Sequence, residues 1–290
     1  MASKRAPAHK SLYRRQLAKK LMGARRAAGL TQAEAARAVE MASASLSKIE
    51  NAERGTTVVL ARALLDAYGV TVEAEREEIL DLVRADQAHR HQWWRDSASY
   101  LNMTRAGLYL GLEGDAEWLH NWEPDLIPGL LQTEDYAREV LTAMRPDLDA
   151  EGVEVLVRVR VGRRRILERE NPATLHAIID EGAVRRLAPT PKILTGQVRH
   201  LLAVSALPHV TVQVLPFEAG LHPGLDGSFV LMGFPEDAPA IAWVENGPNS
   251  VHYEGTQDVG RYTEIFADLR AQALDPDRTE AWLTNVIKES

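Results

Sequence analysis

The side chains best suited to chemistry lie on one face of the segment 43–51, and that chemistry is hydrogen bonding. They are short or basic: Ser43, Ala44, Ser47, Lys48 and Asn51. The opposite face carries Leu46 and Ile49 at i, i+3 spacing, which predicts a helix buried on one side. Lysine, serine and asparagine donate to phosphates and to base edges, so this face has the character of a nucleic-acid recognition surface.

A second short helix is predicted to position that face. Thr31-Gln32-Ala33-Glu34 forms a capping box, in which the threonine hydroxyl bonds the Glu34 amide and the glutamate reaches back to the threonine amide. A small apolar face follows and a turn is expected around 40–42. Two helices joined by a tight turn make a helix–turn–helix, whose second helix enters the DNA major groove.

From about Arg14 to Val70 the sequence resembles the Xre-type, phage-repressor-like DNA-binding domains, through RRAAG, LTQAE, SLSKIENAERGT and LLDAYGV. The remainder resembles the C-terminal domain of unassigned function in actinobacterial Xre-family regulators. The stretches that carry this second resemblance are GLYLGLEGDAEWLHNWEPDLIPGLLQTEDYAREVL, VTVQVLPFEAGLHPGLDGSFVLMGF and RYTEIFADLRAQALDPDRTEAWL. The resemblance implies a sequence-specific transcription regulator bound to double-stranded DNA, whose C-terminal part has no assigned chemistry.

The resemblance also implies which residues meet DNA. They are Thr31, Gln32, Ser43, Ala44, Ser47, Lys48, Asn51 and Arg54. Lysine donates to guanine O6 and N7, serine to almost any edge, and alanine offers a methyl contact to thymine. The amide of Gln32 suits a phosphate or a base-reading neighbour, whereas Asn51 and Arg54 suit phosphates.

One pair of residues and one turn position bear on the stability of this region. Arg25 and Glu50 match an arginine and a glutamate that pair across helices in phage repressors of this type, and a bidentate bridge would lock the recognition helix in place. The alternative is two unrelated surface charges. Glu40 departs from the family pattern, because this turn position tends toward positive φ, where a residue with a Cβ costs on the order of 1 kcal/mol.

Charge divides the chain unevenly. Residues 1–70 hold 13 lysines and arginines against 5 aspartates and glutamates, or +8, and the rest hold 21 against 36, or −15, which together give the net −7. A basic head on an acidic body indicates nucleic-acid binding confined to one end.

Several kinds of chemistry are excluded or not expected. The chain has no cysteine, so disulfides, thiolate zinc sites and cysteine nucleophiles are excluded. His89 and His91 do not share a helix face, so no metal site is expected there. No apolar run approaches the roughly 20 residues of a membrane span. We expect a cytoplasmic protein without metal, cofactor, membrane partner or catalytic residues.

Composition and periodicity predict four parts: a disordered basic arm (1–11), a helix–turn–helix domain (12–72), a helical connecting region (73–150) and a mixed domain for sensing, dimerisation or partner binding (151–290). A surface helix over 73–90 is expected to lead away from the head. In the last part, strands are expected at 174–180 and in VTVQVLPF, GSFVLMGF, AIAWVEN and SVHYE. Their short connections predict a largely antiparallel sheet. The expected fold is a mainly α head and a C-terminal α/β (α+β) domain.

Three features of the body leave alternatives open. The loop 219–228, with His222 and Asp226, is either a ligand or partner loop or a rigid hairpin connection. Its acidic and histidine groups could converge with Asp180, Glu181 and Glu245 into an acid–base cluster. The arginines at 158, 160, 163, 164, 165 and 169 are either an anion or second DNA contact or a solvated face.

The third feature is the apolar run 125–131, interrupted by proline and glycine, whose leucines need cover. That cover comes from the chain's own sheet, from a second copy in a homodimer, or from a small partner protein; relatives are commonly encoded beside a short protein that they are thought to bind. Two functions remain: a regulator with a controlling body, or an autoregulating enzyme or toxin-like effector. The lack of a catalytic motif and the charge division favour the regulator.

Overall fold

The computed structural model describes residues 12–88, 106–187, 189–235, 238–246 and 249–289, so the predicted arm 1–11 and the pair His89 and His91 lie outside it. Contacts divide the chain into two compact units, Met1–Leu112 and Glu113–Ser290, which we call the head and the body. The boundary expected at 151 falls instead at 113, because a strand before residue 150 belongs to the body's sheet.

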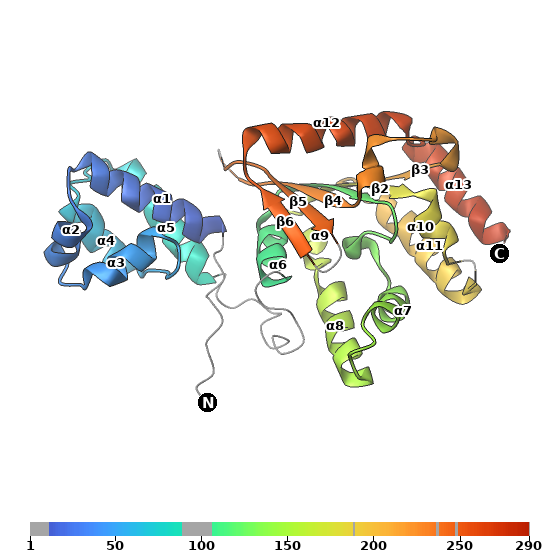
Figure 1. Cartoon of the computed structure of the whole chain (residues 1–290), viewed down its shortest axis with the longest axis horizontal. Coiled ribbons are helices and arrows are strands. Elements are labelled where there is room, and N and C mark those ends of the chain that lie inside the picture. The colour runs from blue at the N-terminus through green and yellow to red at the C-terminus, as the bar shows by residue number, and fades with distance from the viewer. Residues whose placement is uncertain (1–11, 89–105, 188, 236–237, 247–248, 290) are drawn as a thin grey trace. The chain divides into compact units, whose positions relative to one another are not determined.

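Five helices with one apolar core form residues 12–88 of the head (Figure 1). They are α1 (Leu12–Ala27), α2 (Gln32–Ala38), α3 (Ser43–Glu50), α4 (Val58–Ala67) and α5 (Glu73–Ala88). The core includes Leu17, Leu21, Leu46, Ile49 and Leu64. The predicted capping box is present at the start of α2, and at the start of α4 the Thr57 hydroxyl accepts from the Leu60 amide without a reciprocal side-chain bond.

Helix α5 is part of the head, and the expectation of a surface helix leading away from it is wrong. Its residues Ile79, Leu80 and Val83 are at most 2% exposed, within the same core. A buried ion pair from Arg14 Nε to Asp86 Oδ1, 3.1 Å long, joins α1 to α5. A narrow apolar stripe is therefore enough to pack this otherwise charged helix against the domain.

The body contains one six-stranded sheet in the order β3-β2-β1-β4-β5-β6. The strands are β1 (Trp118–Glu123), β2 (Thr174–Asp180), β3 (Val210–Leu215), β4 (Phe229–Gly233), β5 (Ile241–Asn246) and β6 (Asn249–Tyr253). Strand β2 pairs in parallel with β1 and with β3, whereas the β1–β4, β4–β5 and β5–β6 pairs are antiparallel.

The sheet is thus mixed, and the prediction of a largely antiparallel sheet is corrected. The strands expected at 174–180 and beyond are present, but β1 lies in a region expected to be helical. Helices between β1 and β2, and between β2 and β3, provide the long crossovers that parallel pairing requires. Short connections do join β4, β5 and β6, which are antiparallel as expected.

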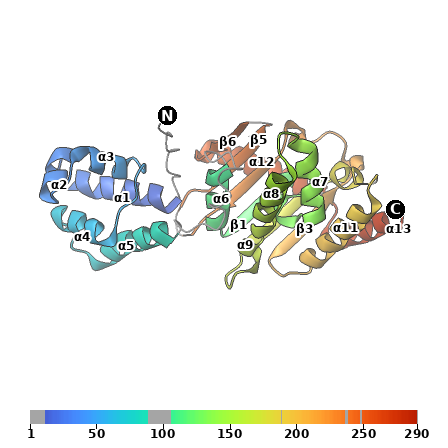
Figure 2. The same ribbon diagram turned by 90° about the horizontal axis from the view of Figure 1, so that it is seen from below.

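Helices cover both faces of the sheet (Figures 1 and 2). Helix α12 (Thr256–Gln272) runs along one face, where Phe266 packs among Trp122, Ile178 and Phe229. On the other side lie α7 (Glu134–Met144) and α8 (Ala150–Gly162). The remaining helices are α6 (Ala106–Asp115), α9 (Arg165–Glu168), α10 (Glu181–Arg185), α11 (Pro191–Ser205) and α13 (Pro276–Lys288).

The apolar run at 125–131 is covered by the body itself. Ile127, Leu130 and Leu131 are each at most 3% exposed, and the short 3-10 helix η3 (Gly129–Leu131) carries two of them. The buried amide of Gln197 donates to the Leu131 carbonyl at 2.7 Å, which satisfies a backbone acceptor that the proline-broken segment leaves open. Of the three kinds of cover considered, the chain's own elements provide it.

We predict that Leu80→Ala destabilises the head by about 2–5 kcal/mol, because it leaves a cavity beside buried neighbours. Leu80 is 2% exposed, whereas Val72, at 60% exposed, offers a matched control whose change to alanine should cost under about 0.5 kcal/mol. Hydrogen exchange of the protected α1 amides in the full chain measures both. Equal exchange in the two variants would contradict the placement of α5 in the head core.

Candidate nucleic-acid interface

Helix α3 presents the predicted recognition residues to solvent. Ser43, Ala44, Lys48 and Asn51 are exposed and Ser47 is half-buried. The opposite face is closed, with Leu46 fully buried and Ile49 at 2% exposure. The structure therefore gathers small donors and one lysine on a single free face. Arg54, three residues beyond the Asn51 cap, is also exposed.

The start of α3 has no side-chain cap. It begins after Ala42, which has no side-chain acceptor, whereas α2 and α4 begin after threonines that bond their first-turn amides. Uncapped amides and the helix dipole favour a negative group at this end. The N-terminal turn of a recognition helix is the part that contacts base edges in helix–turn–helix complexes.

The turns on either side of α3 have left-handed backbone. Glu40 has φ 53°, as the family pattern led us to expect, and Ala52 has φ 57°. The left-handed backbone of Ala52 is not predicted from the sequence, because the only sequence signal for it is its position just after the end of α3. Each Cβ in this conformation costs about 1 kcal/mol, so packing elsewhere in the head must hold both turns.

Glu50, the last residue of α3, is the centre of a buried hydrogen-bond cluster. Its carboxylate accepts from Arg25 Nε at 2.7 Å and from Arg25 Nη2 at 2.9 Å, so the predicted pair is bidentate. The amide of Gln32 donates to Glu50 Oε2 at 2.8 Å. Arg25 also donates to the Leu30 carbonyl at 2.6 Å. One carboxylate therefore ties α3 to α1 and to the beginning of α2.

This arrangement changes the role expected for two of the predicted DNA contacts. The amide nitrogen of Gln32 is bonded to Glu50, so in this structure it supports the recognition helix rather than facing a phosphate. Thr31 Oγ1 donates to Glu34 Oε2 at 2.7 Å and accepts from the Glu34 amide at 3.2 Å, so its hydroxyl serves the cap. Both residues position α3 and α2.

Two groups beside Glu50, Arg25 and Tyr68, have shifted pKa values. The hydrogen bond from Arg25 to Glu50 raises the pKa of that guanidinium above its ordinary value. Nearby, burial and the charge of Glu50 raise the pKa of Tyr68 to about 12, so the phenol stays neutral. The Arg25 guanidinium therefore keeps its charge, and the phenol stays neutral, across the physiological range.

The body's expected acid–base cluster is divided in the structure. The ring of His222 meets the ring of Trp122 edge-on, with the two centroids 5.4 Å apart. Burial raises the pKa of Asp180, while the Gly182 amide and the charge of His222 lower it by less. Glu181 accepts from the Phe217 amide at 2.9 Å. Asp226 is exposed. Glu245 instead interacts with Glu123 and Arg160.

Several of the six arginines in the run make hydrogen bonds or ion pairs with the segments before β1 and after it. Arg163 makes a bidentate pair with the buried Glu113, with contacts of 2.8 and 2.7 Å. Arg164 donates to the Gln132 carbonyl, and Arg169 donates to the carbonyls of Gly114 and Ala116. These three bind groups of their own chain, although Arg169 remains exposed. Arg158 is exposed, as the solvated-face interpretation expects.

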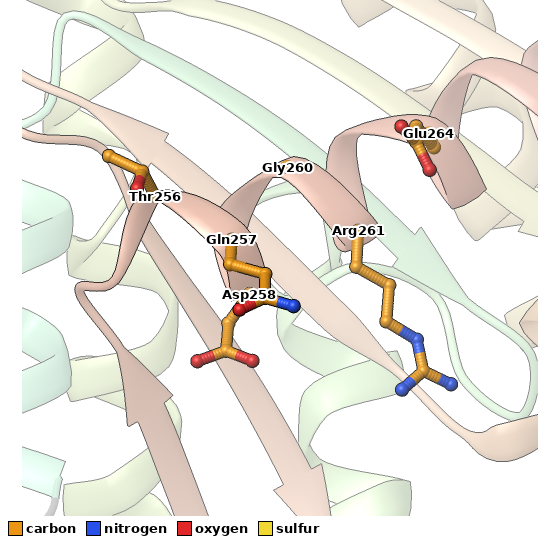
Figure 3. Close-up of a pocket in the computed structure, with 6 residues that line it drawn as sticks. All are labelled: Thr256, Gln257, Asp258, Gly260, Arg261 and Glu264. Carbon is orange, nitrogen blue, oxygen red and sulfur yellow. The ribbon is translucent and has the colours of Figure 1, made fainter.

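A shallow polar hollow lies on α12 (Figure 3). Its lining side chains project from the first turns of the helix: Thr256, Gln257, Asp258, Arg261 and Glu264, beside Gly260. The five side chains are exposed and of both charges, so nothing in it favours one ligand. The described residues contain no group of three or more metal-ligating side chains and no helix that could cross a membrane.

Fold and interface define a two-domain helix–turn–helix protein, a class whose heads bind DNA. The family described as "Helix-turn-helix domain" matches residues 16–79. The family described as "Domain of unknown function (DUF5753)" matches residues 107–285, more than half of the chain, and the chain belongs to that family. No curated protein matches the chain, and no solved structure matches it.

We predict that Glu50→Gln destabilises the head by about 3–5 kcal/mol, because Arg25 is then left buried without its counter-charge. The double change of Arg25 and Glu50 to methionine should recover part of that loss. The matched control is Glu53→Gln, an exposed glutamate three residues on. Hydrogen exchange of α3 amides in the full chain measures these three variants and the two single methionine changes. Additive effects of the two single methionine changes would show that the residues do not interact.

Proposed function

We propose that this chain is a sequence-specific transcription regulator of the Xre type found in actinobacteria, in which the head reads double-stranded DNA and the body controls it. The observation that carries the proposal is the exposed polar and basic face of α3, held by the buried Glu50 cluster. A free face on a rigidly held helix is what base reading requires, because donors must arrive at fixed positions in the groove.

Charge distribution supports the same assignment. Residues 1–70 have a formal charge of +8 and the remainder −15, derived from 13 against 5 and 21 against 36 charged residues. The first 70 residues are attracted to phosphates and the remainder of the chain is repelled, so only one end of the molecule docks. In this proposal the body is a regulatory or partner-binding domain and carries no catalytic step.

One small helical domain neutralises few phosphates, so we propose that the protein acts as a homodimer or with a small partner protein that brings two heads together. The body is the part left to make that association. The exposed apolar side chains of its 217–225 loop, Phe217, Leu221 and Leu225, are consistent with such a contact.

We predict that Lys48→Ala relaxes base preference at one position of the operator and costs about 1–3 kcal/mol on the preferred sequence. Lys48 is exposed on the recognition face, and Lys19, exposed on α1, is the matched control. Selection of bound duplexes from a randomised pool by the full-length variants measures preference. An unchanged preference for Lys48→Ala would remove its base-reading role.

A second test concerns the number of heads on the DNA. We expect full-length protein to protect two half-sites about 10 base pairs apart, or a multiple of that, with binding that weakens steeply as salt increases. Footprinting on the promoter found by genome-wide mapping, combined with sedimentation of the complex, measures site size and stoichiometry. A tight complex of one chain on one half-site would contradict the association proposed for the body.

A further inference from the structure

The two outer edges of the body's sheet differ among the residues that the structure describes. At β3 the chain closes its own edge: the Val214 carbonyl accepts from the Leu274 amide at 2.9 Å, and the Val214 amide donates to Thr279 Oγ1 at 3.1 Å. At the opposite edge lies β6, and the described part of the chain adds no strand beyond it (Figure 1). An edge strand offers backbone donors and acceptors in the arrangement that another strand needs.

The direction of the backbone groups along β6 follows from those of β5. The amide of Glu245, on β5, donates at 3.3 Å to the carbonyl of the residue before β4, so it points away from β6. Backbone groups alternate in direction along a strand, so those of the preceding residue, Val244, point toward its partner Val251 on β6. On either side of Val251, Ser250 and His252 therefore direct their N–H and C=O groups outward, away from β5.

The side chains of β6 suit a further strand as well. The strand contains no lysine, arginine, aspartate, glutamate or proline, the residues that commonly shield an edge. Val251 lies at its centre and is 47% exposed, on the face where its neighbour Val244 packs against the core under α12. The ring of His252 lies on the other face and stacks on Trp243, with the centroids 5.8 Å apart. An uncharged edge with an exposed valine at its centre is therefore presented to solvent.

We propose that two copies of this chain associate through β6, by antiparallel pairing of the strand with β6 of the second copy. A two-fold axis at Val251 places Ser250 opposite His252 of the second copy, and in each such pair the residues exchange both backbone hydrogen bonds. The two Val251 side chains then lie directly opposite each other, on one face of a sheet that continues through both bodies. This close pair removes both valines from water.

The strand is its own complement, which is the reason for choosing a second copy as the occupant. In this register no carboxylate lies opposite another, because Glu254 falls beyond the paired residues. The apolar group that Val251 needs opposite it is supplied by the same residue of the other chain. The ladder is short, so we expect a monomer–dimer equilibrium that depends on concentration. This inference rests on the association proposed for the body, and it names the surface that makes it.

The first test uses Val251→Cys in the full-length chain. The protein has no cysteine, so the only disulfide that can form joins two copies. In the proposed pair the Cα atoms are about 4.5 Å apart, within the range that a disulfide spans. Mild oxidation should cross-link this variant roughly tenfold faster than Leu207→Cys, a control at 39% exposure, because pairing raises the effective concentration of the thiols. Equal rates in the two variants would overturn the proposal.

Sedimentation of the full-length chain without DNA provides a second test. Val251→Lys places two like charges opposite each other and should weaken dimerisation by about tenfold or more, whereas Leu207→Lys should leave it unchanged. Circular dichroism checks that both variants are folded. A dimer that Val251→Lys leaves intact would overturn the role of β6 but not the association itself. A chain that stays monomeric at every concentration would overturn both, and DNA binding by the head is measured separately.

Hydrogen exchange of the unaltered protein keeps the test independent of any substitution. The amides of Ser250 and His252 point outward, whereas the Val251 amide faces β5. As the concentration passes through the dimerisation range, exchange at the first two amides should slow, while the Val251 amide stays protected throughout. Exchange that does not change with concentration at Ser250 and His252 would show that no second copy pairs with this edge, and would overturn the proposal.

Discussion

The Glu50 carboxylate is the constraint on which the geometry of the head depends. Its two oxygens accept three hydrogen bonds, two from Arg25 on α1 and one from Gln32 at the start of α2. The residue is 5% exposed, so its ionisation in the interior is tolerated only because all three donors are present. The same residue ends the recognition helix, so the hydrogen bonds that stabilise its buried carboxylate also fix the orientation of Lys48 and its neighbours.

The backbone of the turns next to α3 is locally strained. Two residues with a Cβ, Glu40 and Ala52, adopt left-handed backbone at either side of α3. Such conformations persist only where the surroundings over-determine them. The apolar core formed by α1, α3, α4 and α5 holds these turns in place, and Leu46 and Leu64 are fully buried in it. A rigid recognition helix is therefore obtained from short turns that are individually unfavourable.

In the body, three arginines bind the segments on either side of β1. Arg163 holds Glu113 on α6, while Arg164 and Arg169 bond the carbonyls of Gln132, Gly114 and Ala116. These bonds satisfy backbone acceptors in segments that have no regular partner. Arg160, one turn earlier on the same helix, stands apart with its single amide contact.

The sequence by itself determined the local structure of the head and most of the strands of the body. The capping box at Thr31, the buried side of α3, the Arg25–Glu50 contact and the strand at 174–180 follow from short-range patterns or from the stated resemblance. These features depend on neighbours within a helical turn, on strand alternation, or on a family pattern that the printed residues carry.

Tertiary structure decided the rest, because the missing information is about partners distant in sequence. Strand β1 reads WLHNWE, which has no clear period of two, and it becomes a strand because β2 and β4 pair with both of its edges. Helix α5 looks like a surface helix until Ile79 and Val83 meet the core. The sequence leaves the arginine run as either an anion contact or a solvated face, yet Arg163 and Arg169 bind groups that are 50 and 55 positions away. Which charges are paired and which remain free is set by that folding.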